Sequence, residues 1–193
     1  MKTPSSRRKD GFTLVELLVV IAIIAVLAGA GFAAGNAAIQ KAKKTTALAT
    51  VVSLEQAVNQ FYTEYGSMPS AVTTDTEISI NDAEGKKLTL TLLGMETGTT
   101  PLNPRAVKFL SAKEGKAKKN GIIYNTSGTA VDGIYDPWGG PYKLMLDGNY
   151  DERITVAPSG GTSVVLNGRR VAAWSEGADY NVGKKPADDV KNF

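Results

Sequence analysis

One carboxylate stands inside an otherwise apolar N-terminal run. Glu16 follows Phe12-Thr13-Leu14-Val15 and precedes a series of mostly aliphatic residues that continues to Ala28. An ionisable side chain at membrane depth is costly, so it is a functional group by default and needs a partner. The sequence therefore predicts that an amine of another chain neutralises Glu16.

The chain offers little for catalysis or for transition-metal binding. It contains no histidine and no cysteine. Histidine is the commonest general base and a common ligand of transition metals, so only oxygen atoms remain to hold a metal ion. No Gly-x-Ser-x-Gly arrangement is present to activate a serine. We therefore expect a protein that is not an enzyme.

One acidic segment has the first spacings of a calcium-binding EF-hand loop. Asp147, Asn149 and Asp151 occupy its first, third and fifth positions. The pattern then fails, because Glu152 replaces the required glycine and Pro158 stands where the bidentate glutamate belongs. We interpret this segment as a hairpin turn.

The basic character of the chain comes from its first residues. The whole chain has 22 Lys and Arg against 19 Asp and Glu, and residues 1–11 hold four of the cations and one of the acids. The remainder therefore carries 18 of each sign. Cations before an apolar segment keep that end in the cytoplasm. This balance gives no indication of nucleic-acid binding by the rest of the chain.

One very long helix is predicted at the N-terminus. The run from Leu14 to Ala34 is long enough to span a bilayer, since about 20 residues suffice. An amphipathic pattern then continues to Tyr65, and Gly66 and Pro69 end it. Such a helix measures roughly 80 Å at about 1.5 Å per residue. Its first half must pack against lipid or against equivalent helices of other subunits.

The middle of the chain, Ser70 to Gly133, gives the weakest signals. The alternation in Lys87 to Leu92 predicts a strand, and a short helix is expected near Arg105 to Ala112. The four lysines between Lys113 and Lys119 indicate a solvated loop or a docking surface for an acidic partner.

The last third of the chain has the pattern of antiparallel strands. Strands are predicted over Tyr142 to Leu146, over Ile154 to Ala157, and on both sides of an Asn167-Gly168 turn of type I′. The predicted class is α+β, with the long helix packed on a small antiparallel sheet that buries one face on its amphipathic half.

The N-terminal motif resembles the signal of type IV pilin-like proteins. A basic leader, then Gly11-Phe12-Thr13-Leu14-Val15-Glu16 and an apolar run, carry this resemblance. It implies that a prepilin peptidase cuts after Gly11 and that Phe12 becomes an N-methylated first residue. It also implies that Glu16 meets the Phe12 ammonium of a neighbouring subunit. The alternative for the same residues is an uncleaved signal anchor in which Glu16 has no role. A secretory signal peptide has its cleavage site after the apolar region, whereas Gly11 precedes that region.

Two further motifs resemble the major pseudopilins of type II secretion systems. They are Asp136-Pro137-Trp138-Gly139 and the ending from Ser175 to Phe193. The resemblance implies one Ca²⁺ ion bound by the tail, with Asp179, Asp188 and Asp189 as carboxylate ligands and with backbone carbonyls near Trp174, Ser175 and Val182. Ca²⁺ takes six to eight oxygen ligands, and a tail with little apolar surface gains order from an ion. The alternative is that Asp188 and Asp189 are solvated charges near the terminus.

The resemblance implies three segments: a cleaved leader at 1–11, a transmembrane and assembly helix at 12–35, and a periplasmic domain at 36–193. The expected protein is a single-pass inner-membrane subunit that assembles into a periplasmic filament. Its expected partners are other copies of itself, minor pseudopilins, the inner-membrane assembly platform and prepilin peptidase. Two alternatives are a type IV pilin or minor pilin for adhesion, motility or DNA uptake, and a membrane-tethered binding module.

Overall fold

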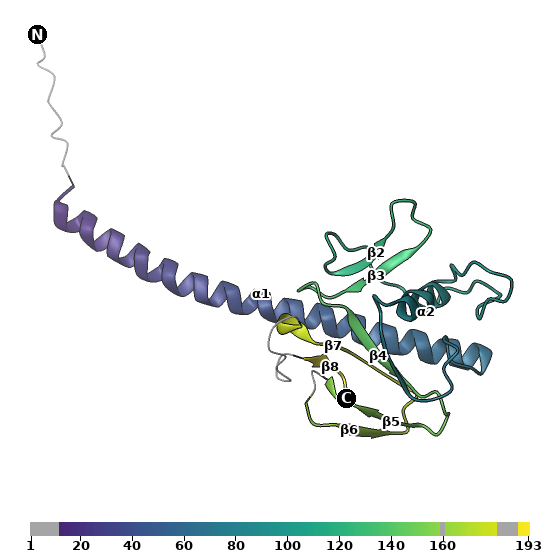
Figure 1. Cartoon of the computed structure of the whole chain (residues 1–193). Coiled ribbons are helices and arrows are strands. Elements are labelled where there is room, and N and C mark those ends of the chain that lie inside the picture. Colours follow the sequence, from purple (N-terminus) through teal and green to yellow (C-terminus); the bar gives the residue numbers. More distant parts are fainter. Residues whose placement is uncertain (1–11, 159–160, 181–188) are drawn as a thin grey trace, which may run out of the picture. The chain divides into compact units, whose positions relative to one another are not determined.

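The computed structural model describes residues 12–158, 161–180 and 189–193 (Figure 1). The chain comprises two compact units, Met1–Lys41 and Ala42–Phe193. Helix α1 runs from Leu14 to Tyr65 and belongs to both units. The predicted long helix is confirmed, and it ends at Gly66, whose positive φ of 69° suits glycine.

In the first unit, α1 exposes its apolar side chains. The exposed residues include Leu14, Leu27 and Phe32, with 79%, 66% and 76% of their surface accessible. By length and composition, α1 contains a stretch that could cross a membrane. An apolar surface of this extent is normally covered by lipid or by another chain.

The second unit combines the rest of α1 with antiparallel strands, as the predicted α+β class requires (Figure 1). The strands form three sheets rather than one. The largest sheet has the order β1-β4-β7-β8, and two separate pairs, β2-β3 and β5-β6, complete the unit. The strands are β1 (Thr76–Ser79), β2 (Gly121–Tyr124), β3 (Val131–Tyr135), β4 (Tyr142–Leu146), β5 (Arg153–Val156), β6 (Val164–Asn167), β7 (Val171–Ser175) and β8 (Val190–Lys191).

The core lies between α1 and the four-stranded sheet. The amphipathic pattern of α1 buries one face completely, with Val51, Leu54, Val58 and Phe61 all at 0% exposure. These side chains belong to the same apolar cluster as alternate residues of the strands, including Leu144 and Leu146 of β4, Ile78 of β1 and Val171 of β7. A second cluster packs Trp174 with Ile154, Val156 and Ala172.

The strand predicted at Lys87 to Leu92 is wrong, because this segment lies in α2 (Ala83–Leu93). The Leu-Thr alternation imitates a strand, but Leu88 and Leu92 are spaced for one face of a helix and both are buried. The threonine hydroxyls also suit the helix: Thr89 Oγ1 donates to the Gly85 carbonyl at 2.8 Å. Gly94 then ends α2 in the left-handed conformation.

The helix predicted near Arg105 to Ala112 is also wrong, because this segment has no regular secondary structure. The backbone N–H groups of Phe109 and Leu110 both donate to the Leu92 carbonyl, at 2.9 and 3.0 Å. The Asn103 side chain accepts from Val107 N and donates to the Val107 carbonyl. These partners hold the backbone in an open loop against α2.

The hairpin predicted around Asn167-Gly168 is wrong in its pairing, although both flanking strands exist. Strand β6 pairs with β5, whereas β7 pairs with β4 and β8 in another sheet. Gly168 N donates to the Glu152 carbonyl at 2.7 Å, so the turn closes against the start of β5. The Asn167-Gly168 segment therefore connects two sheets.

A buried carboxylate on α1 holds the C-terminal strands. Glu55 Oε1 accepts a hydrogen bond from Ala173 N of β7 at 3.0 Å. Its other oxygen, Oε2, accepts one from Asn192 Nδ2 at 2.7 Å, and Arg169 Nη1 lies 3.7 Å from the same atom. Next to Asn192, the Phe193 ring meets the Trp174 ring edge to face. The helix is thus joined to the central strand and to the end of the chain.

We expect Glu55→Ala to lower the free energy of unfolding of the fragment Ala42–Phe193 by about 2–4 kcal/mol, because it leaves the buried Ala173 N–H without its acceptor. Denaturant unfolding measures this loss. The control is Glu64→Ala, which removes an exposed ion pair with Arg105 and should cost less than about 1 kcal/mol. Equal losses from both variants would contradict the role assigned to Glu55.

Candidate functional site

The N-terminal site consists of Thr13, which directly precedes α1, and of Glu16 in the first turn of that helix. Thr13 N and Thr13 Oγ1 both donate to Glu16 Oε2, at 2.8 and 2.6 Å. In return, Glu16 N donates to Thr13 Oγ1 at 3.3 Å. This reciprocal pattern is a capping box, in which a threonine and a glutamate three residues later satisfy the free N–H groups of a helix start.

Thr13 is a residue that the reasoning from the sequence overlooked. The signal for it was present, since Thr13-Leu14-Val15-Glu16 has the Thr-x-x-Glu spacing of a capping box. The structure describes Phe12 and Glu16, one helical turn apart, whereas Gly11 lies outside the described residues. The carboxylate of Glu16 is therefore held at the start of α1 by its own backbone and by Thr13.

A second site joins the turn after β3 to the end of β7. Asp136 is fully buried in this turn. Its Oδ1 accepts N–H groups from Trp138, Gly139 and Gly140 at 2.8, 2.7 and 2.9 Å. Its Oδ2 accepts the Ser175 hydroxyl at 2.6 Å. Burial raises the pKa of Asp136, while the Ser175 hydroxyl and the backbone N–H groups act in the opposite direction.

The segment after β7 is held by a hydrogen bond to Ser175 and by an ion pair between Lys143 and the buried Glu176. Ser175 Oγ also accepts a hydrogen bond from Gly177 N at 3.0 Å. Lys143 of β4 lies 3.0 Å from Glu176 and 3.1 Å from Glu77. Partial burial lowers the pKa of Lys143, but its hydrogen bonds to Glu176 and Glu77 outweigh this effect and raise the pKa. The start of the tail is thus held on the sheet by charged groups.

Trp138 packs against the core of the second unit. The side chain is partly buried against the main apolar cluster, and its backbone N–H binds Asp136. The Asp-Pro-Trp-Gly turn and the Ser175 segment, the two motifs of the C-terminal half, are in direct contact through the hydrogen bond between Asp136 and Ser175.

The predicted calcium ligands are described only in part. Asp179 closes a short 3-10 helix, Gly177–Asp179, directly after β7. Asp189 precedes β8, whose Val190 pairs with Ser175. This pairing brings Asp179 and Asp189 to the same end of β7, and each has one carboxylate oxygen buried. Asp188 and Val182 lie outside the described residues. Within the described residues, no group of three acidic side chains gathers to hold a metal ion.

The segment with EF-hand spacing forms a turn, although not the predicted hairpin. It connects β4 and β5, which belong to different sheets. Asp147 is fully buried and accepts N–H groups from Asp151 and Glu152, at 3.2 and 2.8 Å. The carboxylate that would be the first metal ligand therefore serves the backbone of the turn.

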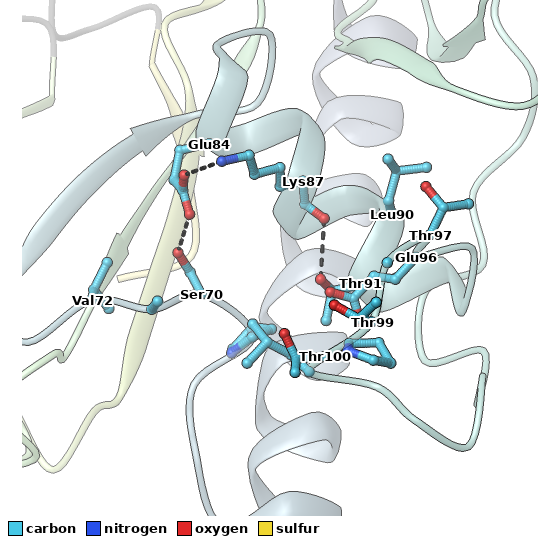
Figure 2. A pocket seen from close by; sticks show the side chains of 15 residues that line it. Ser70, Val72, Glu84, Lys87, Leu90, Thr91, Glu96, Thr97, Thr99 and Thr100 are labelled. Atoms are coloured by element: carbon cyan, nitrogen blue, oxygen red, sulfur yellow. Dashed lines mark hydrogen bonds and ion pairs between the residues drawn. The ribbon is translucent and has the colours of Figure 1, made fainter.

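A pocket of about 710 Å³ lies between α2 and the loop 96–102 (Figure 2). Two of its charged groups lie close together: Ser70 Oγ donates to Glu84 at 2.8 Å, and Lys87 lies 3.6 Å from the same carboxylate. A third, Glu96, accepts the Asn103 N–H at 2.7 Å, and the remaining lining consists of threonine, proline, glycine and aliphatic residues. The pocket therefore gives no clear signal of a ligand.

The comparisons with known proteins agree with the N-terminal motif. Residues 6–32 match the family described as the prokaryotic N-terminal methylation motif. A fimbrial protein of Neisseria meningitidis serogroup A / serotype 4A (strain DSM 15465 / Z2491) is 34% identical over 78 residues, which are 40% of this chain and 46% of that protein. The match thus spans less than half of that relative. No solved structure matches the chain significantly.

The chain thus has a prokaryotic N-terminal methylation motif at the start of a long helix, and the second half of that helix packs on antiparallel sheets. The apolar N-terminal helix of this chain is consistent with membrane anchoring.

We expect Asp136→Ala to lower the free energy of unfolding of the fragment Ala42–Phe193 by about 3 kcal/mol or more, because three N–H groups and the Ser175 hydroxyl lose their acceptor. Asp136→Asn should cost less, because the amide oxygen still accepts the N–H groups. Denaturant unfolding checks both variants. Asp82→Ala is the control, since Asp82 is exposed and makes no side-chain cap. A loss for Asp136→Ala no larger than this control would be inconsistent with the network.

Proposed function

We propose that the chain is the major structural subunit of a type II secretion pseudopilus. Prepilin peptidase cleaves it between Gly11 and Phe12, and Phe12 is N-methylated. Before assembly, the subunit stays in the inner membrane through residues 12–35, with the domain at 36–193 in the periplasm. It then joins a periplasmic filament, which contacts minor pseudopilins and the inner-membrane assembly platform and supports protein secretion.

The observation that carries the filament proposal is the position of Glu16. This carboxylate lies in a helix whose apolar surface is exposed in the first unit. In a low-dielectric environment, a carboxylate and an ammonium relieve each other's desolvation only when they meet in good geometry. Cleavage after Gly11 would create that ammonium on Phe12 of every subunit. The pair would fix the register of neighbouring subunits as well as attract them.

The distinction between a pseudopilin and a pilin is supported by the C-terminal half. The Asp-Pro-Trp-Gly turn and the tail are the segments that resemble major pseudopilins. Their joining by the Asp136–Ser175 hydrogen bond gives both motifs one physical purpose, which is to fix the start of the tail.

We also propose that the tail binds Ca²⁺ through Asp179, Asp188 and Asp189, with carbonyl groups near Ser175 and Val182. The support is the placement of Asp179 and Asp189 at one end of β7. Oxygen donors of this type suit Ca²⁺, which would connect β8 to the start of the tail.

A second candidate function is that of a pilus subunit. The similarity to a fimbrial protein favours it. In that case the same N-terminal residues would drive assembly, and the filament would serve adhesion, motility or DNA uptake.

We expect Glu16→Ala to leave cleavage intact and to lower incorporation into filaments by about tenfold or more, because the Phe12 ammonium then lacks its counter-charge in an apolar environment. Mass spectrometry of the mature N-terminus reports cleavage and methylation, and pelleting of sheared filaments reports assembly. The control is Val15→Ala, which changes no charge. Normal filaments from Glu16→Ala, or a mature N-terminus other than Phe12, would overturn the proposal.

We expect EGTA to lower the melting temperature of the fragment Ala42–Phe193 by about 5–10 °C, because an ion that binds only the folded state stabilises it by about 2–3 kcal/mol at 100 times its dissociation constant. Asp189→Asn should remove this shift. Asp151→Asn, in the turn with EF-hand spacing, should keep it. The absence of any EGTA effect would refute the calcium site and favour the pilin alternative. Loss of the EGTA shift in Asp151→Asn alone would place the ion in the loop between β4 and β5 instead of the tail.

A further inference from the structure

Within the described residues, the second unit presents a cationic turn of which only Lys118 forms an ion pair with the rest of its own domain. We name residues 113–119 the lysine turn; it holds four lysines and one glutamate, a net charge of +3. Lys118 lies 3.3 Å from Asp132, which also binds Lys86 at 3.0 Å. Among the residues that the structure describes, no carboxylate lies within ion-pair distance of Lys113, Lys116 or Lys119, all of which are exposed.

The backbone of the lysine turn is ordered and locally strained. Lys116 and Lys119 exchange two N–H···O hydrogen bonds, of 3.1 and 3.0 Å. Between them, Ala117 and Lys118 have φ values of 50° and 56°, the left-handed region that two-residue hairpin turns normally fill with asparagine or glycine. Strain of this kind persists where the surroundings hold it and often marks a functional surface.

The lysine turn lies against the turn that contains Asp136. Asn120 N donates to the Asp136 carbonyl at 2.8 Å. A Cβ atom added to Gly139 would lie 3.5 Å from Lys119 Cε, so the Lys119 side chain passes over that glycine. The lysine turn is therefore connected to the Asp136 turn by a backbone hydrogen bond and by the Lys119 side chain.

The same unit carries a complementary surface, which we name the acidic loop: the exposed carboxylates of Asp75 and Asp151, which lie beside the buried Asp147. In the described part of the chain, no lysine or arginine lies within ion-pair distance of these three carboxylates. The N–H groups of Gly148 and Asn149 bind the Asp75 carboxylate. Partial burial raises the pKa of Asp75, and the charges of Asp147 and Asp151 raise it further. Asp75 and Asp151 therefore bind N–H groups of residues 148–153, while no cation of the described residues forms an ion pair with them.

The two surfaces belong to different parts of the domain. The lysine turn precedes β2, whereas the acidic loop lies between β4 and β5 and before β1. In Figure 1 the β2-β3 pair and the β5-β6 pair lie on opposite sides of the second half of α1. Residues 12–193 carry 18 charges of each sign, so the charges that remain unmatched within one copy can be matched between copies.

We propose that the lysine turn of one copy docks on the acidic loop of the next copy. This contact joins two different surfaces of the same chain, and such head-to-tail contacts produce open helical filaments when their rotation does not close a ring. Charge complementarity of this kind fixes the register and speeds encounter. The inference rests on the proposed filament function and names the domain surfaces that meet in it.

The test uses engineered disulfides in the full-length chain, which has no cysteine of its own. Lys116→Cys is combined with Asp151→Cys in cells that contain the assembly machinery, and the cells are then oxidised. The expected result is a ladder of covalent multimers on a non-reducing gel. The matched control combines Lys87→Cys with Asp151→Cys, since Lys87 is 75% exposed but lies on α2. Each single-cysteine variant should give no ladder.

Filaments from the same cells are pelleted and quantified, which separates the two ways of failing. Normal filaments without a ladder above the Lys87 control would overturn the docking contact and leave the filament function standing. A wild-type chain that forms no filaments would remove both proposals.

A charge-reversal experiment tests the contact without cysteines. Lys116→Glu with Lys119→Glu should lower the pelleted fraction about tenfold, because like charges then face each other across the contact. Adding Asp75→Lys and Asp151→Lys to that variant should restore the pelleted fraction to within about threefold of wild type. Thermal melting of each variant confirms that the domain is folded. Failure of the reversed pair to restore assembly in a folded protein would overturn the inference.

Discussion

One helix has to satisfy two different environments, and the rest of the structure depends on this constraint. In the second unit, α1 buries Val51, Leu54, Val58 and Phe61 completely against the sheet. In the first unit, its aliphatic side chains are exposed and suit lipid or neighbouring helices. The core of the second unit uses only residues of the second half of the helix, so the first half is left for contacts outside the chain.

Two buried carboxylates turn this helix-on-sheet arrangement into a connected framework. Glu55 joins α1 to β7 and to Asn192, while Asp136 joins the turn after β3 to Ser175 at the end of β7. Both acids bind backbone N–H groups rather than serving mainly as ion pairs. Such bonds are stronger than those between neutral groups, and they specify the path of the C-terminal segment where little apolar surface is available.

The sequence predicted the elements whose signals are local and periodic. The long helix ending at Gly66 and the strands near Tyr142 and Ile154 follow from helical and alternating patterns. The Leu-Thr alternation misled at Lys87 to Leu92, because hydroxyl groups that bond back to the helix allow threonine in α2. The pairing of β6 with β5 depends on contacts distant in sequence, such as Gly168 with Glu152, which no local pattern encodes.

The sequence likewise predicted single residues of the candidate sites but few of the contacts between them. Glu16 stands out from composition alone, whereas its partner Thr13 required attention to spacing. Asp136 and Ser175 each lie in a recognisable motif, but their contact joins residues 39 positions apart and emerges only in three dimensions. Asp179 and Asp189 come together through the pairing of β7 with β8, which the sequence did not predict.

The bond between Thr13 and Glu16 has a consequence for the energetics of polymerisation. In a single copy of the chain, Oε2 of Glu16 already accepts two hydrogen bonds from Thr13. In the proposed filament, each added subunit exchanges the hydrogen bonds between Thr13 and Glu16 for the pair between Glu16 and the Phe12 ammonium of a neighbour. The contribution of this pair to growth is the difference in free energy between the two arrangements. A small difference of this kind would let subunits be stored in large numbers and also be recovered when the fibre shortens.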